Sequence, residues 1–186
     1  MDSTSLSNHF LIAMPRMADP NFFQTVNYIC EHTEDGALGI TVNRPTNITL
    51  GEVLKQMGIP VRDPQISKQI IYDGGPVRQD RGFILHSPAE KWQSSLYIDN
   101  DVALTTSRDI LEAIAAGEGP DHHLIALGYA GWGAHQLEEE LGANAWLTCK
   151  SNADILFHTP YKARWAAAAK LLGVDLALLI DDAGHA

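Results

Sequence analysis

Polar and aromatic groups stand where the β-rich segments of this chain end. Asn43 and Arg44 close one such segment, and His86 closes another. Arg81 lies shortly before His86, and Trp132 lies in a glycine-rich stretch that follows a third segment. Ligands of α/β proteins often bind where loops leave strand ends. Arginine can form bidentate hydrogen bonds with a carboxylate or a phosphate. The sequence therefore predicts one site for an anionic ligand, lined by Arg44, Arg81 and His86, with Asn43 and Trp132 beside them.

Each of these residues also has a structural interpretation. Arginines at strand ends commonly form internal salt bridges or donate to backbone carbonyls. A histidine such as His86 commonly takes part in hydrogen bonds that hold the fold together. On the sequence alone both interpretations stay open, and the separation of Arg44 and Arg81 in the folded chain decides between them.

The glycines from Gly128 to Gly133 are spaced as G-x-x-G-x-G. Dinucleotide-binding folds carry G-x-G-x-x-G, with an acidic residue about 20 positions later at the end of the next strand. Neither the spacing nor the acidic partner fits, and Trp132 would crowd a pyrophosphate. We therefore expect no cofactor, and we expect Gly128, Gly131 and Gly133 to shape the turn that leaves the sheet. The helix that follows still offers free N–H groups to an anion.

The two cysteines, Cys30 and Cys149, are the candidates for a reactive thiol. In an extended strand Cys30 shares a face with His32, whereas Glu31 points to the opposite face. A reactive thiolate needs a cation or a helix N-terminus nearby, and free cysteine is more often a buried apolar residue. Inert packing is therefore the favoured interpretation of both cysteines, and a reactive thiol is the alternative.

Histidine spacing predicts no metal site. The eight histidines are dispersed, and His122 and His123 are neighbours that face opposite sides of an extended segment. No H-x-x-x-H or C-x-x-C pair occurs, and no G-x-S-x-G motif indicates a nucleophile. We therefore expect no bound metal and no catalytic residue. The alternative, an uncharacterised enzyme, needs a site built from loops near Arg44, Arg81 and His86.

Strands interleaved with short helices must position these residues. Strands are predicted from β-rich apolar segments between turn signals, and helices from capping residues and helical spacing. The predicted strands cover 9–13, 25–32, 38–43, 70–72, 82–86, 96–98, 102–106, 123–127 and 145–149. The predicted helices cover 50–57, 108–116 and 160–172, a further helix with Glu138, Glu139 and Glu140 follows the glycine-rich stretch, and a short apolar segment covers 174–180. This pattern favours an α/β fold, a compact mixed β-sheet with hairpins flanked by helices, in a single domain over residues 1–186.

Charge and composition narrow the classes of function. The 186 residues include 13 Lys and Arg against 23 Asp and Glu, a formal net charge of −10. Phosphate backbones select for clustered basic residues, so direct nucleic-acid binding is not expected. No apolar run reaches the roughly 20 residues that span a bilayer, and the N-terminus has no signal-peptide pattern. Two widely spaced cysteines suit a reducing compartment, so we expect a cytoplasmic protein without a membrane segment.

Several long motifs occur in order along nearly the whole chain. They are LIAMPRMADPNF from Leu11, TVNYICEHTEDGALGITVNRP from Thr25, GGPVRQDRGFILHS from Gly74, LGYAGWGAHQLEEEL from Leu127, NAWLT from Asn144 and the terminal GHA. With these motifs the chain resembles the AlgH/YqgE family of bacterial proteins. The resemblance implies a compact α/β fold with a large mixed sheet and a place in the bacterial cytosol. The family takes its name from a proposed role in regulating alginate genes, and the resemblance implies no particular biochemical activity.

One position departs from the family pattern. The family stretch reads G-W-G-x-G-Q-L-E, and here His135 stands before Gln136 where the family has glycine. A side chain thus replaces bare backbone at the start of the helix. This departure puts in doubt any function that needs close backbone approach there.

Three functions are compatible with the sequence. The first is a non-catalytic regulatory protein of the AlgH/YqgE type, which influences transcription indirectly through a small anionic ligand or a protein partner. The second is the uncharacterised enzyme described above. The third is transcriptional control by direct contact with DNA, which the acidic charge and the lack of a basic recognition helix disfavour. We take the first as the prediction.

Overall fold

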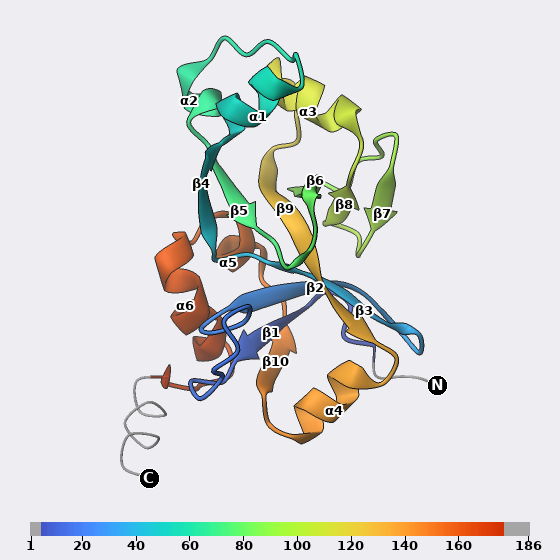
Figure 1. The fold of residues 1–186 in the computed structure, drawn as a ribbon, viewed down its shortest axis with the longest axis vertical. Helices are drawn as coiled ribbons and strands as arrows, with labels where there is room; N and C mark the ends of the chain where they lie inside the picture. The colour runs from blue at the N-terminus through green and yellow to red at the C-terminus, as the bar shows by residue number, and fades with distance from the viewer. Residues whose placement is uncertain (1–4, 177–186) are drawn as a thin grey trace.

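The structure of the chain, a computed structural model, describes residues 5–176 and contains a ten-stranded sheet with helices packed against it (Figure 1). The strands are β1 (His9–Ala13), β2 (Val26–Thr33), β3 (Gly36–Thr41), β4 (Pro45–Thr49), β5 (Ile70–Asp73), β6 (Val77–Ser87), β7 (Ser95–Tyr97), β8 (Ala103–Thr105), β9 (His122–Gly133) and β10 (Trp146–Lys150). The helices are α1 (Leu50–Gln56), α2 (Pro64–Ser67), α3 (Arg108–Ala115), α4 (Gln136–Gly142), α5 (Ala153–Phe157) and α6 (Arg164–Lys170), with the 3-10 helix η1 (Tyr161–Ala163) before α6. The predicted α/β class, a mixed sheet with hairpins and flanking helices, is confirmed.

Strand β9 joins the two parts of the sheet. Its first half lies between β5, which runs parallel to it, and β6, which runs antiparallel, and its second half pairs with β3. The strand order is β10-β1-β2-β3-β9-β6-β8-β7, with β4 and β5 as a branch beside β9. In Figure 1, β9 crosses from the upper group of strands, β4 to β8, into the lower group, β1 to β3 and β10.

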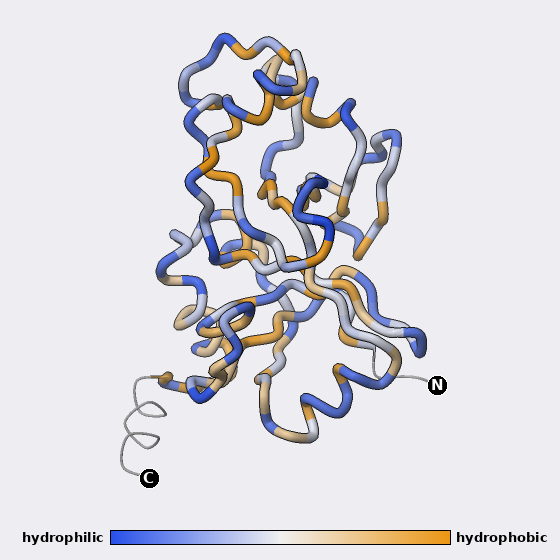
Figure 2. Tube along the Cα trace, viewed as in Figure 1, coloured by the Kyte–Doolittle hydropathy of each residue, from blue (hydrophilic) through white to orange (hydrophobic). Residues whose placement is uncertain are grey.

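Apolar side chains form three core clusters against the faces of this sheet. Side chains of a strand alternate between faces. Along β9, Leu124 therefore belongs to the cluster under α5 and α6, and Ile125 to the cluster under α1 and α3. Further along the strand, Trp132 belongs to the cluster under α4. Full burial of one such aliphatic side chain contributes about 2 kcal/mol. Figure 2 shows hydrophobic segments along the central strands and a hydrophilic tip on the β2–β3 hairpin.

The glycines of the stretch after Leu127 lie inside β9, so the prediction that they shape a turn is wrong. The strand continues through Gly133, and the turn follows it, where His135 has a positive φ of 67°. Gly128 (φ 80°) is needed because a Cβ there would lie 2.5 Å from the carbonyl oxygen of Gly75. A Cβ on Gly75 would in turn collide with the carbonyl group of Tyr129. Close approach of two backbones, rather than a turn, explains Gly128 and Gly75.

A β-bulge in β2 reverses the expected faces of its second half. The register with β3 shifts between Ile29, which pairs with Gly39, and Glu31, which pairs with Leu38. A bulge inserts one unpaired residue, so side chains beyond it change face. His32 therefore lies toward α4, with its Nε2 3.5 Å from a carboxylate oxygen of Glu138, whereas Cys30 packs in the cluster under α5 and α6. The prediction that Cys30 and His32 share a face is wrong.

Short-range signals correctly locate α1 and the β7–β8 hairpin. Thr49 caps α1 through a capping box, because its hydroxyl accepts from the Glu52 N–H and the Glu52 carboxylate accepts from the Thr49 N–H. Asp99 holds the hairpin turn by accepting from the N–H groups of Asp101 and Val102. Ser107 precedes α3 as predicted, but its hydroxyl donates to Asp109 and does not cap the helix.

Other elements are absent from the predictions or differ from them. Helices α2 and α5 were not predicted, because a helix of four or five residues spans little more than one turn and shows no helical period. Strand β4 was not predicted because it begins at Pro45, a residue type that usually ends a strand. The predicted helix 160–172 divides into η1 and α6. Most of the apolar segment 174–180, and the terminal GHA motif, lie outside the described residues.

Substitution of Gly75 by alanine is expected to lower the free energy of unfolding by about 3 kcal/mol or more, because the new methyl group would overlap the β9 backbone. Gly58→Ala is the matched control. Gly58 also has a positive φ (72°), but no atom lies within 4 Å of the added Cβ, so a loss of about 1 kcal/mol is expected. Urea unfolding of both variants measures the difference. Equal losses would show that backbone approach at Gly75 is unimportant.

Candidate functional site

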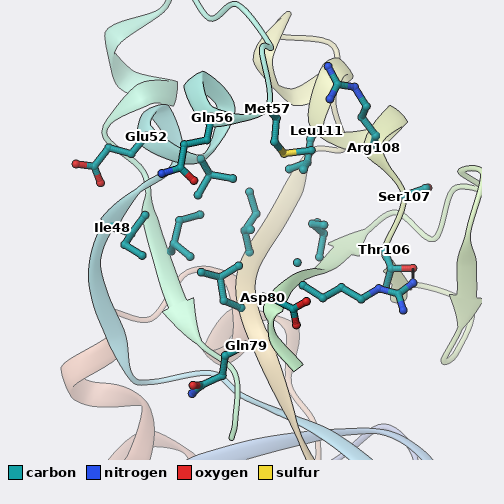
Figure 3. A pocket seen from close by; sticks show the side chains of 17 residues that line it. Ile48, Glu52, Gln56, Met57, Gln79, Asp80, Thr106, Ser107, Arg108 and Leu111 are labelled. Atoms are coloured by element: carbon teal, nitrogen blue, oxygen red, sulfur yellow. Dashed lines mark hydrogen bonds between the residues drawn. The ribbon is translucent and has the colours of Figure 1, made fainter. Parts of the chain in front are cut away.

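A cavity of about 750 Å³ lies between α1 and α3, over the face of β5, β6 and β9 (Figure 3). We call it the α1–α3 cavity. Its floor is apolar and comprises Val53, Met57, Ile71, Ile84, Leu111, Ile125 and Leu127. Polar side chains line its rim, namely Glu52, Gln56, Gln79, Asp80, Arg81, Thr106, Ser107 and Arg108. An apolar cavity with a few convergent polar groups is the usual form of a small-molecule site.

The sequence positions this cavity through α1, α3 and the polar start of β6. Leu54 of α1 and Ile110 of α3 are buried in the cluster beneath, which anchors both helices on the sheet. Strand β6 begins with the exposed polar run Arg78–Arg81 before its apolar half, so the same strand contributes both rim and floor. Figure 3 shows Glu52 and Gln56 on one side of the cavity and Thr106 on the other, with Met57 and Leu111 between them.

Arg81 is the rim cation with capacity left for a ligand. Its Nη2 donates to the hydroxyl of Thr106 at 3.2 Å, which is a neutral partner, and its guanidinium carbon lies 5.9 Å from the centre of the Phe83 ring. The other rim cation, Arg108, is paired with Glu112 at 3.3 Å. Arg81 therefore keeps its positive charge and several N–H donors at the mouth of the cavity.

The rim carboxylates already have partners. A hydrogen bond from Arg78 is the main cause that lowers the pKa of Asp80, and the two groups are 3.2 Å apart. Glu52 is held by the capping box of α1. These contacts leave Arg81 as the rim charge best placed for an anionic group.

The structure does not bring the predicted anion-site residues together. Arg44 donates to the backbone carbonyls of Asn21 (2.7 Å) and Phe23 (3.2 Å), and it lines a separate cavity of about 10 Å³. Asn43 accepts from the Val26 N–H and donates to the Gln24 carbonyl. Both side chains therefore hold the segment before β2, as the structural interpretation proposes for Arg44.

His86 is buried between β6 and β8. Since a carbonyl only accepts, its Nδ1–H donates to the Pro88 carbonyl at 3.0 Å, and its Nε2 then accepts from the Thr105 hydroxyl at 2.7 Å. Burial lowers the pKa of His86. Its ring is thus a hydrogen-bonded part of the sheet, and it does not line the α1–α3 cavity.

Trp132 is buried under α4. Its indole N–H and that of Trp146 both donate to Oε1 of Glu140, at 3.0 and 2.9 Å, and Phe22 stacks on its ring with centres 5.8 Å apart. It contributes to a third, shallow cavity of about 490 Å³ with Gly131. Of the five predicted residues, only Arg81 lines the α1–α3 cavity.

Both cysteines occupy positions that suit inert packing. Cys30 is buried, and burial raises the pKa of its thiol. Cys149 is partly buried, and burial raises its pKa as well. The sulfur atoms lie 3.8 Å from the carbonyl oxygens of Tyr28 and Ala168, respectively. The structure therefore supports the favoured interpretation over a reactive thiol.

A histidine pair that sequence inspection missed lies across β6 and β9. His86 is the register partner of His123, whose Nε2 is 2.5 Å from the amide oxygen of Gln69. Burial, with smaller contributions from His86 and His122, lowers the pKa of His123 to about 4. Only the strand register could reveal this pair, because 36 positions separate the two residues in sequence.

Sequence inspection also missed most of the cavity rim. Gln79 and Asp80 belong to the polar run at the start of β6, which lies before the predicted strand 82–86. Thr106 gains its role only because β8 lies beside β6. The sequence signal that could have located this part of the rim is the polar run itself, because its charged residues directly precede an apolar strand.

Two further expectations concern metal binding and membranes. Within residues 5–176, no group of three or more His, Cys, Asp or Glu side chains is arranged to hold a metal ion. In the same range, no helix is both long and apolar enough to cross a membrane.

Comparison with known proteins finds matches over nearly the full length. A family model described as AlgH-like matches residues 10–177. A UPF0301 protein of Thioalkalivibrio sulfidiphilus is 56% identical over 184 residues, covering 99% of this chain and 98% of its own. A UPF0301 protein of Xanthomonas axonopodis pv. citri is 56% identical over 183 residues, covering 98% and 97%.

Two solved structures share the fold. The solution structure of the AlgH protein from Pseudomonas aeruginosa is 52% identical and has a TM-score of 0.82, covering 96% of this chain and 95% of its own. A crystal structure of a protein from Corynebacterium diphtheriae has a TM-score of 0.75 at 19% identity, covering 96% and 92%. At that identity the second match concerns the fold alone.

His123 is expected to make stability fall as the pH is lowered. Its pKa is about 4 in the folded chain against an ordinary value of 6.5, so the unfolded chain binds the proton more tightly. The stability present above about pH 6.5 is therefore lost progressively as the pH falls toward about 4. Between pH 7 and pH 4.5 the wild type should lose about 2 kcal/mol more than His123→Gln, measured by urea unfolding. Parallel losses in the two proteins would contradict this assignment.

The folded thiols are expected to react slowly with iodoacetamide at neutral pH, because burial raises both pKa values and restricts access. Mass spectrometry should show alkylation at least about tenfold slower than for free cysteine, and slower at Cys30 than at Cys149. The same chain in urea is the control and should react at both positions. Reaction of either folded thiol at the rate of free cysteine would restore the reactive-thiol alternative.

Proposed function

Because this chain belongs to the AlgH-like family, we propose that it is a non-catalytic regulatory protein of the bacterial cytoplasm that binds a small ligand with an apolar body and one anionic group. The ligand occupies the α1–α3 cavity. Ligand binding influences transcription indirectly, because it changes how the protein binds a protein partner. The observation that carries this proposal is the position of Arg81 above an apolar floor.

The floor selects the body of the ligand. Its side chains come from α1, α3 and three strands of the sheet, and they leave a cavity of about 750 Å³. Burial of apolar surface contributes about 25 cal/mol per Å², so an alkyl chain or aromatic ring gains most of its affinity there. A volume in this range suits a small molecule rather than a polypeptide.

Arg81 selects the anionic group. Thr106 uses only one of the five guanidinium N–H groups, and as a neutral partner it adds no counter-charge. A carboxylate at the mouth can then accept charge-assisted hydrogen bonds from Arg81. The carboxylate of Asp80 is hydrogen-bonded to Arg78, and its interaction with Arg81 is the weaker one, an attraction between charges without a hydrogen bond.

Ligand binding at this position can be sensed at the protein surface. The cavity is lined by α1, by the start of β6 and by the segment from Thr106 into α3. A ligand that contacts all three elements stabilises one arrangement of them relative to others. A partner that recognises this surface would then bind differently with and without the ligand. The net charge of −10 favours such a protein partner over direct contact with DNA.

Decanoate and decanol provide probes that differ in the anionic group. We expect decanoate to bind the wild type, with saturable amide shifts around the cavity in a two-dimensional NMR titration. Arg81→Gln should weaken decanoate binding about fivefold or more, the effect of losing one partly exposed charge-assisted contact. The affinity for decanol should stay unchanged, because its hydroxyl carries no charge.

Arg62→Gln is the matched control, since Arg62 is exposed and does not line the cavity. This variant should bind both probes like the wild type. Absence of saturable shifts with either probe would refute the cavity as a ligand site. An equal effect of Arg81→Gln on both probes would refute the role of the charge.

A further inference from the structure

A second cleft, of about 460 Å³, lies where β5 and β9 begin, beside α5. We call it the α5 cleft. Lys68, Asp121, His122, His158 and Arg164 are among the residues that line it. It shares only Ile125 with the α1–α3 cavity, so it can bind a ligand independently of the function proposed above.

Arg164 is the unusual member of this cleft because it is a buried cation, only 5% exposed. Its Nε donates to the Ile155 carbonyl at 3.1 Å, its Nη1 donates to the Val42 carbonyl, and its guanidinium carbon lies 5.2 Å from the centre of the Tyr72 ring. Two backbone carbonyls orient the guanidinium but do not neutralise its charge. Among residues 5–176, no carboxylate forms an ion pair with it. Burial of an unneutralised charge is costly unless an anion accompanies it.

The lining of the cleft is more basic than acidic, whereas the chain as a whole is acidic. The protein has 23 acidic and 13 basic side chains, but this lining holds two fixed cations, Lys68 and Arg164, and one carboxylate, Asp121. Two imidazoles, of His122 and His158, lie at its mouth with their ring centres 4.6 Å apart. Imidazole, ammonium and guanidinium groups are all hydrogen-bond donors to oxyanions.

Arg164 has donors left for such an anion. A guanidinium has five N–H groups, and the two carbonyls use two of them. The Nη2 atom has no hydrogen bond within the described part of the chain, and it is not among the solvent-inaccessible polar atoms that lack a partner. Its N–H groups are therefore not fully shielded, and Arg164 is one of the residues that line the cleft. Arg164 is therefore held in a fixed orientation by two carbonyls, and its Nη2 side is left for a ligand.

We propose that the α5 cleft binds the phosphate group of a small molecule, with Arg164 as the buried anchor and Lys68 and His158 as donors at the rim. Two fixed cations match the double charge of a phosphate monoester better than the single charge of a carboxylate. The rings of Phe157 and Tyr72, which also line the cleft, contact the remainder of the ligand. Arg164 is on α6 and His158 directly follows α5, two elements that the anion-site prediction from the sequence did not include.

Inorganic phosphate is the probe, titrated into the full chain labelled with ¹⁵N. We expect saturable shifts of amides in the segments 121–124 and 156–158. The double variant Lys68→Gln, His158→Gln removes two exposed rim groups without disturbing the buried Arg164, and it should weaken phosphate binding about tenfold. Lys162→Gln, an exposed residue of η1 that does not line the cleft, should leave binding unchanged.

Arg164→Lys tests the anchor itself, because lysine keeps the charge and loses the planar fork. Its spectrum first shows whether the fold is retained, and a folded variant should bind phosphate at least about tenfold more weakly. Three results would each overturn the proposal. They are a wild type without saturable shifts, a rim variant with wild-type affinity, and shifts centred on Arg81 and Thr106 instead of the α5 cleft.

Discussion

The close approach of the backbone around Gly75 to strand β9 is the constraint on which the sheet depends. The Gly74 N–H donates to the Leu127 carbonyl of β9 at 2.8 Å, and the Gly74 carbonyl accepts from the Thr41 N–H at the end of β3, also at 2.8 Å. Gly74 thus links the first half of β9, which pairs with β5 and β6, to β3, which pairs with the second half of β9. Only glycine permits this distance, because a Cβ would overlap the neighbouring backbone.

Both candidate sites depend on that junction through β9. The strand supplies Ile125 and Leu127 to the floor of the α1–α3 cavity, and it supplies His122 to the mouth of the α5 cleft. Although the chain is acidic, its arginines differ in whether a carboxylate is paired with them. Arg44 donates to carbonyls and Arg108 is paired with a carboxylate, whereas Arg81 and Arg164 lie beside a cavity and form no ion pair with a carboxylate among residues 5–176. A cation without a counter-charge beside an open cavity attracts an anion, and this unequal pairing is the physical basis of both proposals.

Much of the fold can be predicted from local signals. The capping box at Thr49 locates α1, and the Asp99 turn locates the β7–β8 hairpin. These features act within a few residues, so they are legible in the sequence. The role of Gly128 in β9 was not predicted, because a glycine that permits backbone approach looks the same in sequence as a glycine that forms a turn. The bulge after Ile29 was missed for a similar reason, since it depends on the register with β3.

The sequence by itself determined the class of fold, the order of most strands along the chain and the acidic charge. Tertiary structure alone decided which polar groups meet. It separated Arg44, His86 and Trp132 from Arg81, placed Thr106 beside it, and buried Arg164 beside a cleft built from β5, β9 and α5. The physical reason is the distance along the chain over which each kind of interaction acts. Turns, caps and periodicity act between near neighbours in the chain, whereas a site is assembled by strand register and packing across long sequence separations.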